Sequence, residues 1–582
     1  MLSRRGWRVA IFGILGLAIL GAVWAGWQAW RVNDDLTAAV ADADSLQSAA
    51  RSGDQEQLDS SLASLRQNSR AAADRTSGLT WSVLSHLPVF GDDARGVRVA
   101  SDVIADLGDR GLEPLVAAAD DFDTMLPRNG GVPVQGLRDL RSPVGEALEA
   151  LTAAEDRLAE EDSSGYITRL RDKYRELDAT VGEVRGFLAS ADTALEVMPT
   201  MLGDGEPRQY LLVLQNNAEI RAAGGLAGSV SVVTAQDGKV GLVRQVPVSS
   251  LGEAPAPVLP LTKGERDLYG EVLGTYPLNA TMTPDPARAS DLLRARWNGE
   301  FPDEAVDGVL FVDTVALSYV LEAVGGVTVD GIELTGENLV DELLHNVYLR
   351  LTDPAEQDVF FGRVAAAAFQ RFTTGLSDGA GVIRALNRAA GERRVLVHSY
   401  EETEQRALDG TAVAGGLAQD SDRTPQVMVT LDDTTGAKMS YFLRYDVDVK
   451  ATWCTDGVQG YTGKASLSSV APRDAASLPP YVTGGGQFGI DAGEQLVTLR
   501  LYAPVGGAIG ELRWNGAPME LDKVDLDGRE VGMTYVQLAP GEKVDLSWTM
   551  RGAKGQTADG VLAVTPTIDK TDNVKALPSA CR

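Results

Sequence analysis

The amino-acid sequence predicts a multidomain α+β protein with an N-terminal transmembrane helix, a helical bundle or stalk, an α/β layered domain and a C-terminal β-sandwich. Three observations predict this order. An uncharged apolar stretch lies near the N-terminus, apolar residues then recur at helical spacing, and short strand-like runs follow them. The expected boundaries are 1–31 for the cytoplasmic tip and anchor, 32–204 for the helices, 205–424 for the α/β domain and 425–582 for the sandwich.

Length, composition and charge exclude several classes of protein. The 582 residues are enough for three or four folded units at roughly 100–200 residues each. With 44% hydrophobic and 23% charged residues, the composition excludes wholesale disorder and a polytopic membrane protein. The 53 Lys and Arg against 82 Asp and Glu leave a net charge of −29, which repels phosphate backbones. Nucleic acid is therefore not an expected partner.

The N-terminal segment predicts the compartment. Val9–Trp30 carries no formal charge and, at about 1.5 Å per residue, its helix is long enough to cross a bilayer core of about 30 Å. Arg4, Arg5 and Arg8 precede it, which favours a cytoplasmic N-terminus and an extracytoplasmic remainder. We expect a single-pass protein of the cell membrane whose partner at this segment is the lipid bilayer. A cleaved signal peptide ending near Val23–Ala25 is the alternative.

The two cysteines, Cys454 and Cys581, fit an exported chain, because a lone pair in an oxidising compartment favours a disulfide. Two unpaired thiols remain the alternative. The three histidines, His86, His345 and His398, are too few and too scattered to predict a zinc site or a Ser/His/Asp triad. No metal site and no cofactor are predicted from these residues.

Apolar stripes at helical spacing predict the helical region. They are Leu58, Leu62 and Leu65, then Val144, Leu148, Leu151 and Leu158, then Tyr174, Leu177, Val181, Val184 and Leu188. Polar and acidic residues fill the other helix faces, so the stripes are expected to pack against one another as an antiparallel bundle or stalk. A coiled coil that binds a partner is the alternative.

Strand-like runs begin at residue 209. The run Gln209–Leu214 suits a buried strand, and two further runs flank a hairpin turn at Asp237 and Gly238. Helical patterns over 286–297, 315–324 and 336–350 follow these strands, and this alternation predicts an α/β layered domain. After about residue 425, alternating runs punctuated by Gly and Pro predict a small β-sandwich.

The loop directly after the first strand is the candidate ligand site, since open α/β sheets bind ligands at the carboxyl ends of their strands. Its glycines permit close approach of the backbone, and successive N–H groups beside an arginine can hold an anion. The alternative is a structural turn in which asparagines cap the chain and Glu219 pairs with Arg221. The candidate residues are Asn216, Asn217, Glu219, Arg221, Gly224, Gly225 and Ser229.

The same loop carries a resemblance to a known family. Together with Val306–Val309, Asp313 and Leu334–Asn338, the run from Asn216 to Ser229 resembles the domain-of-unknown-function 4012 family. This resemblance covers roughly residues 75–575. It implies a single-pass envelope protein of a kind found widely in actinobacteria, and it implies no activity.

A weaker similarity suggests a mechanism. The order of strand, arginine-bearing loop, hairpin and later helices is similar to the LytR-CpsA-Psr phosphotransferases, which move glycopolymers from a polyprenyl pyrophosphate carrier to the cell wall. This similarity implies that Arg221, Arg350 and Arg363 contact pyrophosphate. The chain departs from that family at 225–229 and 247–249, where an aspartate and a second arginine are missing.

Two functions follow from these patterns. The first is an extracytoplasmic envelope protein that binds an anionic or glycan ligand, such as a glycopolymer or a polyprenyl-phosphate glycolipid, without transfer chemistry. The alternative is a divergent phosphotransferase in which Asp285, Asp291 or Asp313 holds Mg²⁺, with Asp313 best placed after a strand. Against the alternative, an aspartate before Thr314 has the usual position of a helix cap.

Overall fold

The computed structural model describes most of the chain. The described residues are 27–49, 54–88, 90–118, 127, 130–374, 379–417 and 424–581. The chain divides into two compact units, residues 1–126 with 133–199, and residues 127–132 with 200–582.

The predicted fold class is corrected at its N-terminal transmembrane helix, which the structure does not support. Within the described ranges, no helix is both long enough and apolar enough to cross a bilayer. The predicted segment Val9–Trp30 lies outside the described residues except for its last four, which begin a helix over 27–49. The fold class that the structure supports is multidomain α+β.

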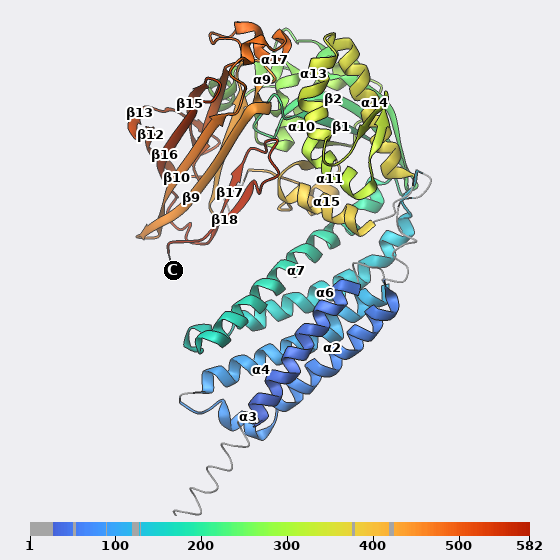
Figure 1. Cartoon of the computed structure of the whole chain (residues 1–582), viewed down its shortest axis with the longest axis vertical. Helices are drawn as coiled ribbons and strands as arrows, with labels where there is room; N and C mark the ends of the chain where they lie inside the picture. The colour runs from blue at the N-terminus through green and yellow to red at the C-terminus, as the bar shows by residue number, and fades with distance from the viewer. Residues whose placement is uncertain are drawn as a thin grey trace, which may run out of the picture. The chain divides into compact units, whose positions relative to one another are not determined.

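The first unit is built from helices (Figure 1). Most residues of its apolar stripes are buried: Leu58, Leu62 and Leu65 are each less than 9% exposed, and so are Leu151 and Leu158, whereas Val184 is 40% exposed. Asp54 begins the α2 helix by accepting a hydrogen bond from Gln57 N at 3.0 Å, which satisfies a free N–H of the first turn. The bounds are α2 Gln55–Thr76, α3 Leu79–Leu84, α4 Gly91–Asp106, a π-helix Leu107–Leu112, α6 Val134–Ala159 and α7 Thr168–Met201.

The second unit contains a five-stranded mixed sheet in the order β3-β2-β1-β4-β7. The strands β1 and β4 are parallel, and the other neighbours are antiparallel. The predicted hairpin is present: Asp237 and Gly238 have φ angles of 50° and 80°, which a tight two-residue turn requires. The bounds are β1 Arg208–Asn216, β2 Leu226–Gln236, β3 Lys239–Pro247, β4 Gly308–Asp313 and β7 Val395–Ser399.

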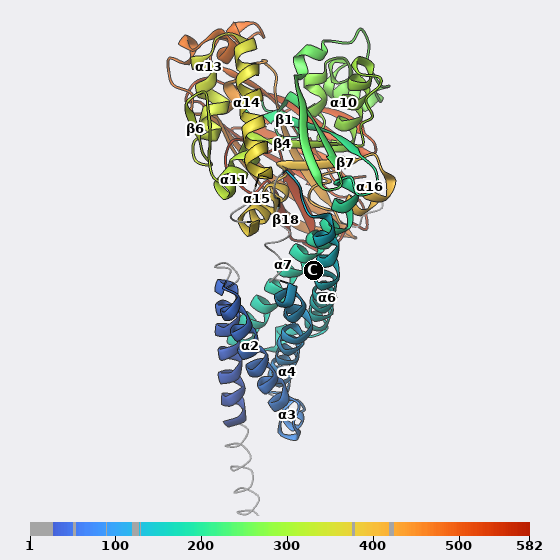
Figure 2. The same ribbon diagram turned by 90° about the vertical axis from the view of Figure 1, so that its right-hand side faces the viewer.

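Helices cover both faces of this sheet. Figure 2 shows β1 and β4 between α14 on one side and α10 on the other. The α10 side buries Leu292, Leu293 and Trp297, each at most 2% exposed. The principal helices are α8 Lys263–Tyr269, α9 Val272–Thr275, α10 Pro286–Glu300, α11 Thr314–Val324, α12 Leu339–Asp341, α13 Val347–Arg350, α14 Pro354–Thr373, α15 Gly379–Gly391, α16 Glu402–Leu408 and α17 Pro480–Thr483.

Asp-Pro pairs begin the helices α10 and α14. Asp285 accepts a hydrogen bond from Ala287 N at 3.0 Å, and Asp353 accepts one from Ala355 N at the same distance. The proline in the first helical position lacks an N–H that would have no partner there, so the pair suits a helix start.

Two further sheets form the sandwich, with strand orders β13-β12-β16-β10-β9 and β14-β15-β11-β8-β17-β18. Inward-facing Leu499, Leu546 and Trp548 are at most 2% exposed. The predicted disulfide is confirmed, since Cys454 and Cys581 are bonded. The bounds are β8 Gln426–Asp433, β9 Leu443–Thr455, β10 Val458–Ser469, β11 Gln495–Tyr502, β12 Ala508–Trp514, β13 Ala517–Met519, β14 Asp522–Leu526, β15 Arg529–Leu538, β16 Lys543–Arg551, β17 Gly560–Val564 and β18 Val574–Leu577.

Candidate functional site

The candidate loop lies between β1 and β2 and folds back on the end of β1. Asn216 caps it, because its Oδ1 accepts a hydrogen bond from Ala218 N at 3.0 Å. Gly224 has a φ of 127°, and a Cβ on Gly225 would lie 2.5 Å from the backbone of Asn216. Both glycines are therefore required by the tight return of the chain.

Arg221 is buried within this turn. Its Nη1 donates to the carbonyl oxygens of Ile220 and Asp433, at 3.0 and 3.1 Å, and its Nη2 donates to Asn279 Oδ1 at 3.4 Å. The residue is only 6% exposed. Burial raises the pKa of Asp433, and the Arg221 guanidinium partly opposes that rise. Arg221 thus holds the loop against the sandwich strand β8.

Glu219 does not pair with Arg221. Its carboxylate forms an ion pair with Lys438, and both side chains are at most 8% exposed. The loop is therefore a packed turn, but the predicted pairing of Glu219 with Arg221 is wrong, because Glu219 pairs with Lys438 and Arg221 donates to backbone carbonyl oxygens.

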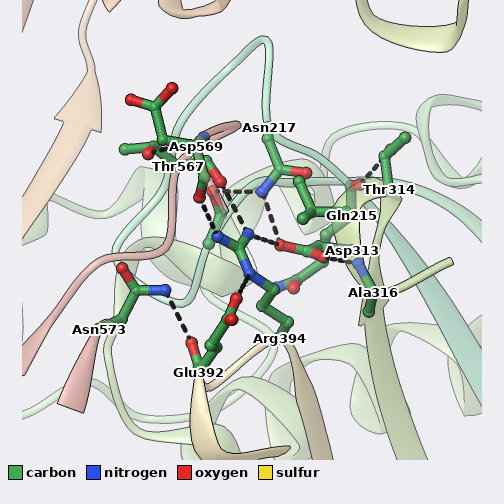
Figure 3. Close-up of polar contacts among 12 residues, drawn as sticks. Gln215, Asn217, Asp313, Thr314, Ala316, Glu392, Arg394, Thr567, Asp569 and Asn573 are labelled. Atoms are coloured by element: carbon green, nitrogen blue, oxygen red, sulfur yellow. Dashed lines mark hydrogen bonds and ion pairs between the residues drawn. The ribbon is translucent and has the colours of Figure 1, made fainter. Parts of the chain in front are cut away.

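Asp313 lies at the end of β4, beside the end of β1, and Figure 3 shows how its carboxylate is used. Its Oδ1 accepts a hydrogen bond from Ala316 N at 2.7 Å, so it caps α11. Its Oδ2 accepts one from Asn217 Nδ2 at 3.0 Å and pairs with Arg394 Nη1 at 2.8 Å. Both carboxylate oxygens are occupied by protein donors.

Arg394 links this carboxylate to the C-terminal part of the chain. Its Nε pairs with Glu392 at 2.6 Å, and its Nη atoms donate to the carbonyl oxygens of Thr567 and Asp569. Figure 3 shows these groups converging on the guanidinium from both sides. Asn573 also donates from its Nδ2 to the carbonyl oxygen of Glu392 at 2.9 Å.

The other predicted charges lie in separate ion pairs. Arg350 pairs with Glu342 at 2.6 Å, and Arg363 pairs with Asp330 at 2.6 Å. Asp291 lies 3.8 Å from Arg294. No contact that the structure describes brings Arg350 or Arg363 to the loop of Arg221.

The residues at Asp313 do not fit Mg²⁺. This ion requires oxygen ligands with free lone pairs, whereas both oxygens of Asp313 accept hydrogen bonds and one is paired with a guanidinium. Among the described residues, no group of three or more His, Cys, Asp or Glu side chains is arranged to hold a metal ion.

A row of uncharged polar and aromatic side chains begins at the strand ends that flank the loop, where Asn216 of β1 and Ser229 of β2 are partly exposed. Gln245 Nε2 donates to Ser229 Oγ at 3.0 Å. Asn216 lies next to Gly228, the residue before Ser229 in β2. The Nδ2 of Asn216 donates to Tyr348 Oη at 2.7 Å. The ring of Tyr348 lies 5.8 Å from that of Tyr481, which is 45% exposed. We call Gln245, Ser229, Asn216, Tyr348 and Tyr481 the amide–tyrosine row.

Sequence reasoning found only part of this row. Asn216 and Ser229 were predicted, whereas Gln245, Tyr348 and Tyr481 were not. Gln245 lies in β3, where the local sequence shows no sign of a ligand site. Its Oε1 is buried and has no hydrogen-bond partner. The signal that was available for Tyr481 is its place in the Pro-rich segment 478–482.

Residues 205–348 match the family model described as "Protein of unknown function (DUF4012)". The family prediction is confirmed over this segment, which contains the candidate loop, Asp313 and Tyr348. The predicted similarity to LytR-CpsA-Psr enzymes is not shown. No curated protein and no solved structure matches the chain.

Proposed function

We propose that this protein is an extracytoplasmic cell-envelope protein that binds a neutral glycan at the amide–tyrosine row and does not transfer it. The observation that carries the proposal is the composition of the row, in which the partly exposed Asn216 contacts the buried Tyr348 and that ring contacts the half-exposed Tyr481. Gln245 and Ser229, both partly exposed, add an amide and a hydroxyl that are hydrogen-bonded to each other.

These side chains suit a sugar. Amides and hydroxyls offer both donors and acceptors, as a sugar hydroxyl requires. A half-exposed tyrosine ring offers an apolar face to the C–H face of a pyranose, with a polar hydroxyl at its rim. A few placed polar groups beside aromatic rings are the usual composition of a small-molecule site.

The charged side chains near the loop are less suited to an anionic ligand. Arg221 in the loop, Lys438 beside Glu219 and Arg394 beside Asp313 are each buried in contacts with protein oxygens. A transferase function would need a carboxylate free to hold a cation, but Asp313 and Asp285 cap helices and Asp291 lies beside Arg294.

The disulfide supports an extracytoplasmic location, because such bonds persist in oxidising compartments and are rare in the cytosol. The net charge of −29 supports a partner other than nucleic acid.

The test is titration of the full chain with soluble neutral oligosaccharides from the cell envelope, measured by calorimetry. We expect Tyr481→Ala to weaken binding by about two- to tenfold, since an aromatic contact contributes about 0.5–1.5 kcal/mol. Gln245→Ala should also weaken it. Tyr535→Ala is the matched control, because Tyr535 is 48% exposed on the sandwich strand β15.

Equal binding by Tyr481→Ala, Gln245→Ala and the unaltered protein would exclude the row as the binding site. Binding of inorganic phosphate in preference to the oligosaccharides would instead favour an anionic ligand.

A further inference from the structure

Glu219 and Lys438 form a contact that the glycan site does not use. Glu219 lies in the β1–β2 loop, and Lys438 lies in the turn between β8 and β9. Their charged groups are in direct contact, and their side chains are only 8% and 5% exposed. Both groups have therefore been removed from water.

The groups around Lys438 offer its Nζ few partners other than Glu219. Its Nζ lies over the ring faces of Tyr348 and Tyr481, 5.2 and 4.5 Å from their centroids, and Glu219 is the carboxylate that meets it. Burial lowers the pKa of Lys438 to about 7, so that the uncharged amine is accessible near neutral pH.

The backbone holds both residues in place. Glu219 N donates to Asn216 O at 3.2 Å, and Leu226 N donates to Glu219 O at 2.9 Å. Lys438 N donates to Val482 O at 2.9 Å. Two reactants fixed in contact within a dry site react with the advantage of an intramolecular reaction.

We propose that Glu219 and Lys438 are joined by an intramolecular isopeptide bond. Transfer of one proton within the ion pair gives a neutral amine and a neutral carboxylic acid. The Nζ lone pair attacks Cδ of Glu219, a new C–N bond forms, and the C–O bond of the hydroxyl breaks. That hydroxyl takes a proton from Nζ and departs as water, so no oxidant, cofactor or other reactant is needed.

Burial favours the amide over the ion pair. Two buried charges keep a desolvation penalty that their attraction only partly offsets, whereas a neutral amide carries a much smaller one. The bond would join the loop of the mixed sheet to the sandwich, as a second covalent link beside the Cys454–Cys581 disulfide. Its test does not depend on glycan binding.

Mass spectrometry of a tryptic digest of the full, reduced chain tests the bond. Without it, trypsin releases Gln209–Arg221, Thr424–Lys438 and Met439–Arg444 as separate peptides. With it, trypsin does not cleave after the acylated Lys438, so we expect one branched species that joins Gln209–Arg221 to Thr424–Arg444. Its mass should be one water less than the sum of these two peptides. Thr424–Lys438 as the predominant free peptide would overturn the proposal.

Two variants test which lysine forms the bond. Lys438→Arg should abolish the branched species, and Lys450→Arg should leave it unchanged, since Lys450 is 74% exposed on β9. A branched species that persists in Lys438→Arg would overturn the assignment. The digest of the unaltered protein decides the question even where a variant fails to fold.

Discussion

Asp313 and Arg394 form an ion pair at 2.8 Å in which neither side chain has any exposed surface. The pair lies where β4 ends and α11 begins, and Arg394 also binds the carbonyl oxygens of Thr567 and Asp569 near the C-terminus. The aspartate that a phosphotransferase would use for Mg²⁺ therefore fastens the mixed sheet to the last part of the chain.

Arg394→Met should destabilise the protein strongly. Removing one partner of a buried pair leaves an uncompensated charge and costs about 3–5 kcal/mol. Here Asp313 loses its ion-pair partner, and Glu392 keeps only the half-exposed Arg388 as a partner cation. The free energy of unfolding, measured by urea denaturation, should fall by that amount. Arg388→Met is the control: Arg388 pairs with Glu392 but is 48% exposed, so its loss should cost at most about 1 kcal/mol. Equal losses for the two variants would contradict this account.

Arg221→Ala should lower stability and leave glycan binding intact. Its guanidinium donates to two carbonyl oxygens and to Asn279, and hydrogen bonds to a charged group contribute about 1.5–3 kcal/mol each. The melting temperature should fall clearly, whereas calorimetry below that temperature should give an unchanged affinity for the oligosaccharide. Arg350→Ala, which removes a half-exposed ion pair, should change neither quantity. A loss of affinity without a loss of stability would show that Arg221 contacts the ligand.

Local patterns predicted much of the local structure. The run at 209–214 became β1, and the Asp237-Gly238 turn joins β2 to β3. The segments 286–297 and 315–324 became α10 and α11. These features depend on periodicity, caps and turn residues that lie within a few positions of one another. The cap role of Asp313 was also visible as an alternative, because it depends only on the residues that follow it.

The partners of the buried charges could not be predicted. Arg394 donates to the carbonyl oxygen of Thr567, and Arg221 donates to that of Asp433. These partners are so far apart in the sequence that local periodicity cannot predict the contacts. Glu219 and Arg221 are close enough in sequence to suggest a pair. In the folded chain, however, Glu219 pairs with Lys438, and Arg221 donates to the carbonyl oxygen of Asp433. Charged groups in a packed interior find whichever partners the tertiary fold brings to them.

Stability should decrease when the pH falls below 6.5, through His398 among other groups. Burial lowers the pKa of His398 from its ordinary value of 6.5, with Asp291 and Asp285 opposing the shift and Arg294 adding to it. The folded state then binds fewer protons than the unfolded state between the two pKa values, so the free energy of unfolding falls as the pH falls through that window. Urea denaturation between pH 7 and about pH 5 should show a smaller loss in His398→Gln. His86→Gln, on an exposed surface, should retain the full loss. An unchanged slope in His398→Gln would contradict the assignment.

The Cys454–Cys581 disulfide should contribute substantially to the stability of the sandwich. It connects β9 to the end of the chain across 127 residues, and in the chain-entropy model a loop of that length constrains the unfolded state by about 4–5 kcal/mol. Alkylation of the denatured, unreduced protein should label no thiol, and reduction should expose both. The Cys454→Ser/Cys581→Ser double variant should match the reduced protein in stability and should not respond to reductant, which separates loss of the bond from other effects of the reagent. Two thiols labelled before reduction would contradict the bond, and equal stability with and without reductant in the unaltered protein would show that the fold does not depend on it.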